Sequence, residues 1–234
     1  MTTTSPPESV ASAPISPRWG IPTVVAALLG FVVLSFGVSV ALVALGADPV
    51  TAGIVATPVG WLALAGLPIV MSLRRGNGPR SDLAWRFRPV DLGIGALGGL
   101  VVLVAAVVFV LVYVQLTGDT PTSSLGVAAG EAQADWQVVA LATLALAAPF
   151  VEELHFRGAW WSALRRRGLG GWPTLLLTAG LFAVIHLEPT RVALLFAAGL
   201  AAGYVRLVTD RLGPAIVAHL LINGIAVIGL LSLL

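Results

Sequence analysis

Long apolar segments recur along this 234-residue chain, and they constrain its fold more than any other feature. A helix needs about 20 apolar residues to cross the hydrocarbon core of a bilayer. Charged residues make up only 10% of the chain, whereas a soluble domain carries about 25%. The sequence therefore predicts an all-α, polytopic transmembrane helix bundle, integral to the cell membrane. The predicted spans, about seven in number, are residues 22–46, 51–73, 91–116, 137–164, 172–187, 190–208 and 213–232.

The N-terminal segment differs in composition from the rest of the chain. Residues 1–19 are rich in Ser, Thr and Pro and predict a disordered tail. The apolar stretch that follows exceeds the roughly 7–15-residue core of a cleaved signal peptide, so we interpret it as the first transmembrane helix. This divides the chain into the tail, N-terminal transmembrane helices over residues 20–130, and a helical core over residues 137–230.

The placement of arginine, which supplies all thirteen basic residues, predicts the orientation of the spans. If the N-terminus is cytoplasmic and the spans alternate, twelve of the thirteen arginines fall on the inner side and only Arg191 lies outside. Cytoplasmic loops carry such an excess, so we expect the C-terminus outside. The pI of about 9.9 does not indicate a nucleic-acid partner, because the arginines lie in short loops beside apolar segments. The absence of cysteine excludes disulfides and thiolate chemistry.

Two loop and packing features add to this picture. The loop over residues 73–91 mixes arginines with Trp85 and Phe87, which is typical of a positive-inside anchor with interfacial aromatics. A lipid-headgroup or substrate-docking surface is the alternative interpretation. Two small-residue motifs predict close helix packing and leave the oligomeric state open. They are Gly95-x-x-x-Gly99 and Gly199-x-x-x-Gly203.

Four ionisable side chains fall within six residues of the fourth segment, in Glu152-Glu153-Leu-His155-Phe-Arg157. Charge at membrane depth costs at least a few kcal/mol per group, so a carboxylate pair here indicates a site, although the polar end of a span is the simpler alternative. Glu153 and Arg157 lie four residues apart and can pair on one helical face. Glu152, about 100° further round, has no local partner and is the better free base. His155 is interpreted as a local hydrogen-bonding or interfacial residue.

Further polar residues stand in apolar surroundings later in the chain. Phe182 and His186 lie four residues apart, as do His219 and Asn223, so each pair shares a helical face. A histidine and an asparagine can together form an oxyanion hole. Pro149 removes a backbone hydrogen bond and predicts a kink or local opening. We therefore expect a polar site between the later helices.

The depths of these residues do not agree for straight spans. At about 1.5 Å per residue, Glu152 and His186 lie roughly 20 and 21 Å from the inner face. His219 and Asn223 lie only about 8 to 14 Å above Gly213. The last helix must therefore begin recessed or tilt.

Three motifs in the later segments together resemble those of the CPBP family of intramembrane proteases. That family contains Rce1-type CAAX prenyl endopeptidases and bacterial Abi proteins linked to bacteriocin processing and self-immunity. The resemblance covers residues 137–230, and the earlier segments resemble the family only as hydrophobic spans. The motifs are Glu152-Glu153-x-x-x-Arg157, Phe182-x-x-x-His186 and His219-x-x-x-Asn223.

The resemblance implies an endopeptidase that hydrolyses a peptide bond in a membrane-associated peptide or protein substrate. Glu152 would act with His186 to activate water, and His219 and Asn223 would stabilise the oxyanion. The reaction would take place in a water-filled cavity that opens to the inner leaflet or the cytoplasm. The implied supporting pair is Glu153 and Arg157.

The resemblance leaves the cofactor open. The family is commonly labelled metalloprotease, although a metal-independent glutamate mechanism is also proposed for it. His186, His219 and Glu152 would supply a three-ligand zinc site with an open position. The chain has no His-Glu-x-x-His motif, so its spacing does not demand zinc. We favour the glutamate mechanism and keep zinc as the alternative.

Three other functions account for part of the pattern. A non-catalytic immunity or regulatory partner in the membrane would share the fold without requiring the complete polar set. A bis-histidine haem protein would use His186 and His219 and leave Glu152, Arg157 and Asn223 unexplained. An ion or proton transporter would use the buried carboxylates, but the chain shows no clear inverted repeat.

Overall fold

Helices are the only regular elements over residues 16–232 and 234, the part of the chain that this computed structural model describes. The predicted disordered tail lies, up to residue 15, outside the described residues. The helices are α1 (Ile21–Ala44), α2 (Pro49–Trp61), α3 (Leu67–Arg75), α4 (Pro79–Asp82), α5 (Val90–Thr117), α6 (Ser124–Gly130), α7 (Asp135–Glu153), α8 (Trp161–Arg166), α9 (Gly171–Ile185), α10 (Val192–Thr209) and α11 (Gly213–Leu231).

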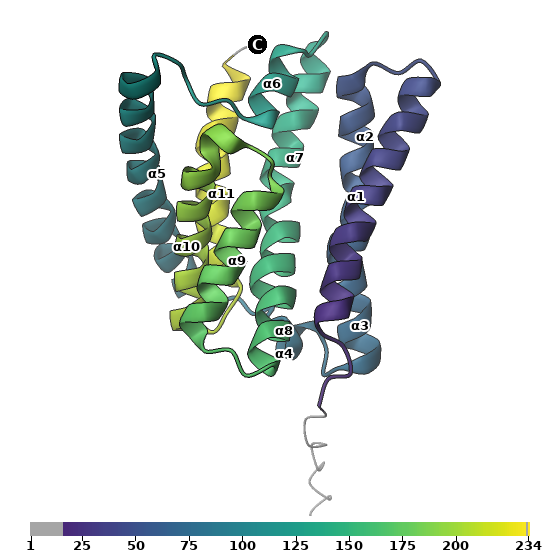
Figure 1. The fold of residues 1–234 in the computed structure, drawn as a ribbon, viewed down its shortest axis with the longest axis vertical. Helices are drawn as coiled ribbons and strands as arrows, with labels where there is room; N and C mark the ends of the chain where they lie inside the picture. The colour runs from purple at the N-terminus through teal and green to yellow at the C-terminus, as the bar shows by residue number, and fades with distance from the viewer. Residues whose placement is uncertain (1–15, 233) are drawn as a thin grey trace, which may run out of the picture.

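Three short irregular helices join or precede these elements. The π-helix η1 (Leu62–Gly66) joins α2 to α3, the π-helix η2 (Leu154–Trp160) joins α7 to α8, and the 3₁₀-helix η3 (Pro189–Arg191) precedes α10. The long passes stand side by side, with α1 to α3 on one flank of α7 and α9 to α11 on the other (Figure 1). Six passes among the described residues are long and apolar enough to cross a membrane, and α9 is a shorter apolar helix. The prediction of about seven spans is therefore confirmed.

Helix α9 is the shortest of the passes, and its length positions a predicted site residue. Its 15 residues extend only about 22 Å, so its C-terminal end, which His186 caps, stops short of the end that α7 reaches (Figure 1). The connection that follows is tied to the segment around α6. Glu188 accepts a hydrogen bond from the backbone N–H of Ser124 at 2.7 Å and pairs with Arg191 at 2.7 Å.

Glycine allows α5 and α11 to pack closely. A Cβ atom added at Gly95 would lie 2.5 Å from the Cβ of Val217, and one added at Gly99 would lie 2.8 Å from the carbonyl oxygen of Ala218. The predicted close packing is therefore confirmed at this motif. It is also confirmed at the second motif, where Gly199 and Gly203 of α10 meet Ala179 and Leu175 of α9.

Gly95→Ala should lower the free energy of unfolding by about 1–3 kcal/mol, because the added methyl group overpacks the α5–α11 contact. Gly93→Ala is the matched control on the same helix, since a Cβ there would meet nothing within 4 Å. Denaturant unfolding of the detergent-solubilised protein measures both. Equal unfolding free energies for the two variants would show that the close approach does not limit the packing.

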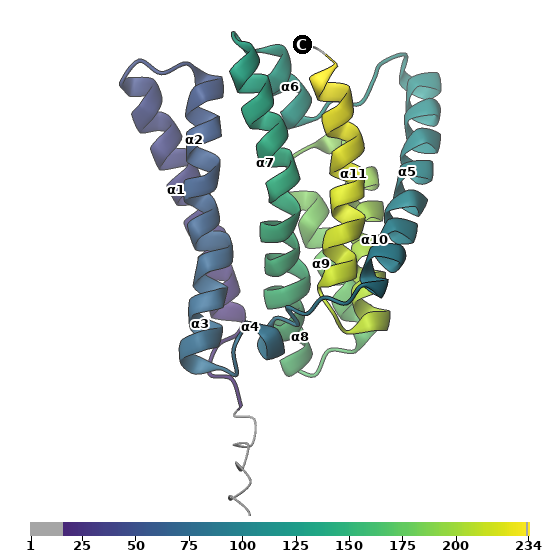
Figure 2. The same ribbon diagram turned by 180° about the vertical axis from the view of Figure 1, so that it is seen from behind.

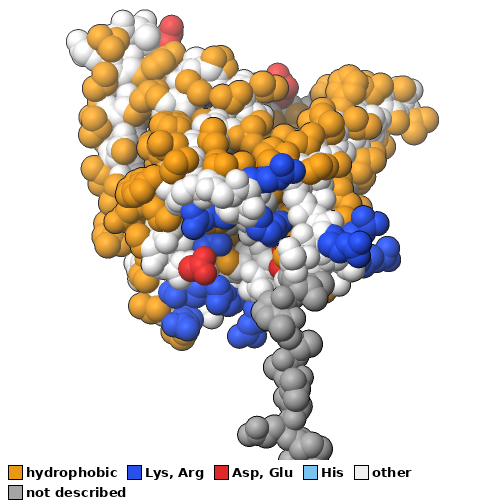
Figure 3. Space-filling model, turned by 60° about the horizontal axis from the view of Figure 1, so that its bottom comes forward, with side chains coloured by type: hydrophobic (Ala, Val, Ile, Leu, Met, Phe, Trp, Pro, Cys, Tyr) orange, Lys and Arg blue, Asp and Glu red, His pale blue; other side chains and the backbone are white. Residues whose placement is uncertain are grey.

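One end of the bundle, which we call the arginine-rich end, is folded around a buried carboxylate. Asp82 accepts hydrogen bonds from the indole N–H of Trp19 at 2.9 Å and the hydroxyl of Ser72 at 3.1 Å. Its carbonyl accepts from the hydroxyl of Ser162 in α8. The loop predicted as an anchor thus also joins α1, α3 and α8. Arginines gather over this end of the molecule (Figure 3).

The last helix begins recessed from this end, as the depth estimate predicts. The backbone N–H groups of Leu212 and Gly213 donate to the carbonyls of Ala84 and Arg86 at 3.0 and 3.2 Å. These bonds hold the start of α11 against the 84–86 loop, so that α8 extends beyond the α10–α11 connection (Figure 2). Arg211 in this connection donates to the buried Asp91, and these hydrogen bonds raise the pKa of the Arg211 guanidinium.

Candidate active site

The π-helix η2 follows Glu153 and places the charged residues of the fourth pass inside the protein. Arg157 Nη1 lies 3.1 Å from Glu153 Oε1, and the two side chains are 0% and 1% exposed, so the predicted pairing is confirmed. Arg157 Nη2 also donates to the carbonyl of Gly199 in α10 at 2.8 Å. Arg206 Nε donates to the carbonyl of Arg157 at 3.0 Å. The pair therefore fixes the fourth pass against α10.

An aromatic ring connects this ion pair to the histidines. The Phe182 ring is 2% exposed, and the guanidinium carbon of Arg157 lies 4.8 Å from its centroid. The same ring lies 4.5 Å from the His186 ring and 5.6 Å, edge-on, from the His219 ring. Phe182 thus limits the orientations that both imidazoles can adopt.

Hydrogen bonds assign the same tautomer to both histidines. His219 Nδ1 lies 2.9 Å from Glu153 Oε1, the oxygen that also pairs with Arg157. His186 Nδ1 lies 2.6 Å from the carbonyl oxygen of Phe182. A carboxylate or carbonyl oxygen only accepts, so each Nδ1 carries the proton in the neutral ring. Each Nε2 then presents a lone pair.

Glu152 faces both of these lone pairs. Its Oε2 lies 3.9 Å from His186 Nε2 and 3.9 Å from His219 Nε2. Its side chain remains 21% exposed, and it has no arginine partner within ion-pair distance among the described residues. The structure therefore brings together three residues from three different helical passes and separates the two glutamates as the helical spacing predicts.

Asn223 is positioned by the proline one turn before the cluster. Because Pro149 has no N–H, the carbonyl of Ala145 has no helical partner from that position. Asn223 Nδ2 of α11 donates to this carbonyl at 2.8 Å. Helix α7 continues through Pro149 to Glu153, so the local opening predicted here takes the form of a freed carbonyl. An amide NH₂ has two donors, and one remains for another acceptor.

The side chains predicted as alternative zinc ligands do not fit tetrahedral coordination. Zinc ligands at about 2.0–2.1 Å stand about 3.4 Å apart in a tetrahedral site. Glu152 Oε2 is 3.9 Å from the Nε2 atom of His186 and equally far from that of His219. No group of three His, Cys, Asp or Glu side chains over residues 16–232 has the geometry to hold a metal ion.

His155 has a larger structural role than the sequence indicates. The residue is 0% exposed, its Nδ1 donates to the carbonyl of Leu64 at 3.0 Å, and its Nε2 accepts from Trp160 Nε1 at 3.1 Å. The interfacial interpretation is wrong because the ring is fully buried, whereas the local hydrogen-bonding interpretation is confirmed by Trp160, five residues away. The other partner lies 91 residues away in η1. The ring thus joins η1 to η2. The sequence feature that could have indicated this role is a tryptophan five residues after the histidine in an apolar run.

The comparisons with known proteins address the same part of the chain. Residues 134–225 match the family model described as type II CAAX prenyl endopeptidase Rce1-like. No curated protein and no solved structure matches the chain. The matched residues contain every predicted site residue, from Glu152 to Asn223. The family supports a membrane-embedded protease of the CAAX type in general. Residues 134–225, which form the later passes of this integral membrane protein, are thus similar to the Rce1-like family.

Proposed function

We propose that the chain is an intramembrane endopeptidase that hydrolyses a peptide bond in a membrane-associated peptide or protein, with residues 137–230 as its catalytic core. The observation that carries the proposal is the position of Glu152. Its carboxylate stands 3.9 Å from the free nitrogens of His186 and His219, which come from different passes. The N-terminus lies in the cytoplasm and the C-terminus outside in this proposal, as the distribution of arginines indicates.

In the proposed first step, Glu152 and His186 activate a water molecule. A gap of 3.9 Å is too long for a direct hydrogen bond and fits a water about 2.8 Å from each group. His186 Nε2 accepts one proton of the water in a hydrogen bond, and the Glu152 carboxylate removes the other as the oxygen attacks the peptide carbonyl. Glu152 then holds that proton and delivers it to the departing amine.

The oxyanion formed by this attack would be stabilised by Asn223 and His219. Asn223 supplies the amide N–H that is not bonded to Ala145. His219 donates from Nε2 only when its ring is protonated, and the Glu153 carboxylate at 2.9 Å stabilises that imidazolium. Glu153 and Arg157 therefore act as positioning residues. Donors aimed at a developing oxyanion each contribute about 10²–10³ in rate.

No step of this mechanism uses zinc, so the effect of a chelator on peptide cleavage tests it directly. We expect wild-type protein to cleave membrane peptides at the same rate with and without chelator. His186→Ala should lower kcat by about 10²-fold or more, because the attacking water loses its orientation. The assay uses purified protein in detergent or liposomes. Loss of activity with chelator would favour the zinc alternative. Full activity of His186→Ala would contradict the proposed role of His186.

The principal rival is a non-catalytic membrane partner on the same fold. It predicts no peptide cleavage by the wild type and full biological activity for variants at Glu152 and His186. The bis-histidine haem alternative predicts a Soret absorption band from the purified protein. The proposal predicts cleavage and no such band.

A further inference from the structure

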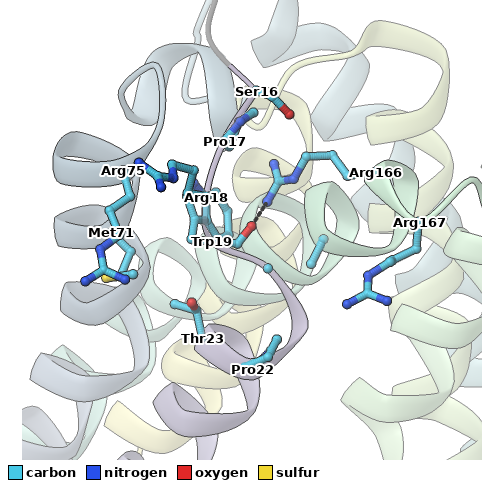
Figure 4. Close-up of a pocket in the computed structure, with 12 residues that line it drawn as sticks. Ser16, Pro17, Arg18, Trp19, Pro22, Thr23, Met71, Arg75, Arg166 and Arg167 are labelled. Carbon is cyan, nitrogen blue, oxygen red and sulfur yellow. Dashed lines mark hydrogen bonds between the residues drawn. The ribbon is translucent and has the colours of Figure 1, made fainter.

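A cavity of about 490 Å³ lies at the arginine-rich end, far along the fourth pass from Glu152. Three elements surround it: the start of α1, the end of α3 and the end of α8 (Figure 4). The proposed hydrolysis uses none of its residues. The lining is Ser16, Pro17, Arg18, Trp19, Gly20, Pro22, Thr23, Met71, Arg75, Ala163, Arg166 and Arg167, and we call it the arginine pocket.

The lining carries four positive charges and no acidic side chain. Arg18 and Arg75 come from the α1 and α3 side, and Arg166 and Arg167 from the end of α8 (Figure 4). Over residues 16–232, the guanidinium groups of Arg18, Arg75 and Arg167 make no ion pair or hydrogen bond. Several unpaired cations that face one cavity favour an anionic ligand.

The floor of the arginine pocket is built from buried groups. Trp19 is 6% exposed, and its indole donates to Asp82, which is also 6% exposed. The guanidinium carbon of Arg166 stacks 4.2 Å from the Trp19 ring, and its Nη2 donates to the Trp19 carbonyl at 3.2 Å. These contacts hold the ring and one arginine in fixed positions. The floor and one arginine are therefore preorganised, and the exposed side chains of Arg18, Arg75 and Arg167 surround them.

The surroundings of the arginine pocket favour a lipid over a soluble anion. On α1, residues three and seven positions after Pro22 lie on the same face. These residues, Val25 and Leu29, are 37% and 59% exposed. A lipid-facing apolar surface thus begins directly above the arginines. A phosphate held by guanidinium groups at this level would place acyl chains along that surface.

We propose that the arginine pocket binds the phosphate of an anionic phospholipid headgroup from the leaflet at the arginine-rich end. Arginine recognises phosphate through paired N–H donors, and basic pockets between transmembrane helices suit anionic headgroups. The bound lipid joins the start of α1 to the end of α8. Helix α8 continues through η2 into the helix that carries the carboxylates, so the lipid stabilises that pass.

Lipid titration of the full chain in non-ionic detergent, followed by native mass spectrometry, tests the proposal. We expect phosphatidylglycerol to bind at least about tenfold more tightly than phosphatidylcholine. The triple variant Arg18→Gln/Arg75→Gln/Arg167→Gln should lose at least about tenfold in affinity for phosphatidylglycerol. It should keep the wild-type unfolding temperature in lipid-free detergent, since these guanidinium groups bond to nothing in the described chain.

The matched control removes the same charge at the same end of the molecule but outside the pocket. Arg74→Gln/Arg80→Gln/Arg88→Gln should change the affinity for phosphatidylglycerol by less than about threefold. An equal loss in the two triple variants, or equal binding of the two lipids, would overturn the proposal. Displacement of the lipid by millimolar inorganic phosphate alone would identify a soluble-anion site instead. Because neither variant changes Glu152 or a histidine, peptide cleavage remains a separate readout.

Discussion

Glu152→Gln should lower kcat for peptide hydrolysis by about 10²–10⁴-fold and leave the fold intact. The amide keeps the shape of the side chain but cannot remove a proton from water. The side chain is 21% exposed and pairs with no arginine, so its neutralisation leaves no buried charge uncompensated. Initial rates at several concentrations of a membrane peptide separate kcat from KM, and thermal unfolding reports the fold.

The matched control is the same substitution at Glu131, an exposed residue that follows α6 on the opposite side of the bundle from the arginine-rich end. Glu131→Gln should keep wild-type kcat. A combined Glu152→Gln/His186→Ala variant should be hardly slower than Glu152→Gln alone, because the two residues act on one water. Multiplicative losses in the double variant would indicate that the two side chains act in different steps.

The organisation of the passes could be predicted from the sequence because hydrophobic length determines it. Every predicted span corresponds to a helical pass, and the ends differ by a few residues. The predicted segment for α9, residues 172–187, is already shorter than a full span of about 20 residues. The sequence could not show where the helix stops, which is at Ile185 with His186 as its cap. The position of the loop that follows depends on the hydrogen bond between Glu188 and the backbone of Ser124 in α6, which is a tertiary contact.

The candidate site could likewise be predicted only in part: local pairs follow from helical spacing, whereas contacts between passes do not. Local spacing predicted the pairing of Glu153 with Arg157, because a helical repeat places them together. The hydrogen bond from His219 to Glu153 spans 66 residues and could not follow from spacing. It gives Glu153 two partners on one oxygen, which spacing did not indicate. The bond from Asn223 to the carbonyl that Pro149 frees is likewise visible only when α7 and α11 are packed.

Tertiary contacts also explain why the interfacial interpretation of His155 is wrong. In sequence this residue stands beside charged neighbours near the end of an apolar run, which is typical of an interface. The π-helix η2 directs the His155 ring toward η1, where the Leu64 carbonyl accepts its hydrogen bond. A π-turn adds a residue to the helical repeat and changes which side chains face inward. The two π-helices η1 and η2 lie against each other here, and neither has a clear sequence signal.

Glu153→Gln should lower the free energy of unfolding by about 3–5 kcal/mol, because it leaves the guanidinium of Arg157 buried without a counter-charge. Arg157 is 0% exposed, so water cannot replace the lost carboxylate. Reversible denaturant unfolding in detergent measures the change. The exposed pair Arg86–Asp210, with side chains 42% and 77% exposed, supplies the control. Arg86→Gln should cost only about 0–1 kcal/mol.

The double variant Glu153→Gln/Arg157→Met distinguishes a charge effect from a packing effect. In the described chain, Glu153 Oε2 and Arg157 Nε have no hydrogen-bond partner, so the buried pair is incompletely satisfied. Removing both charges should therefore restore most of the stability that Glu153→Gln loses. Activity should not recover, because His219 still lacks the carboxylate that stabilises its protonated ring. Recovery of both stability and cleavage would instead mean that Glu153 serves only the ion pair, and that His219 acts without it.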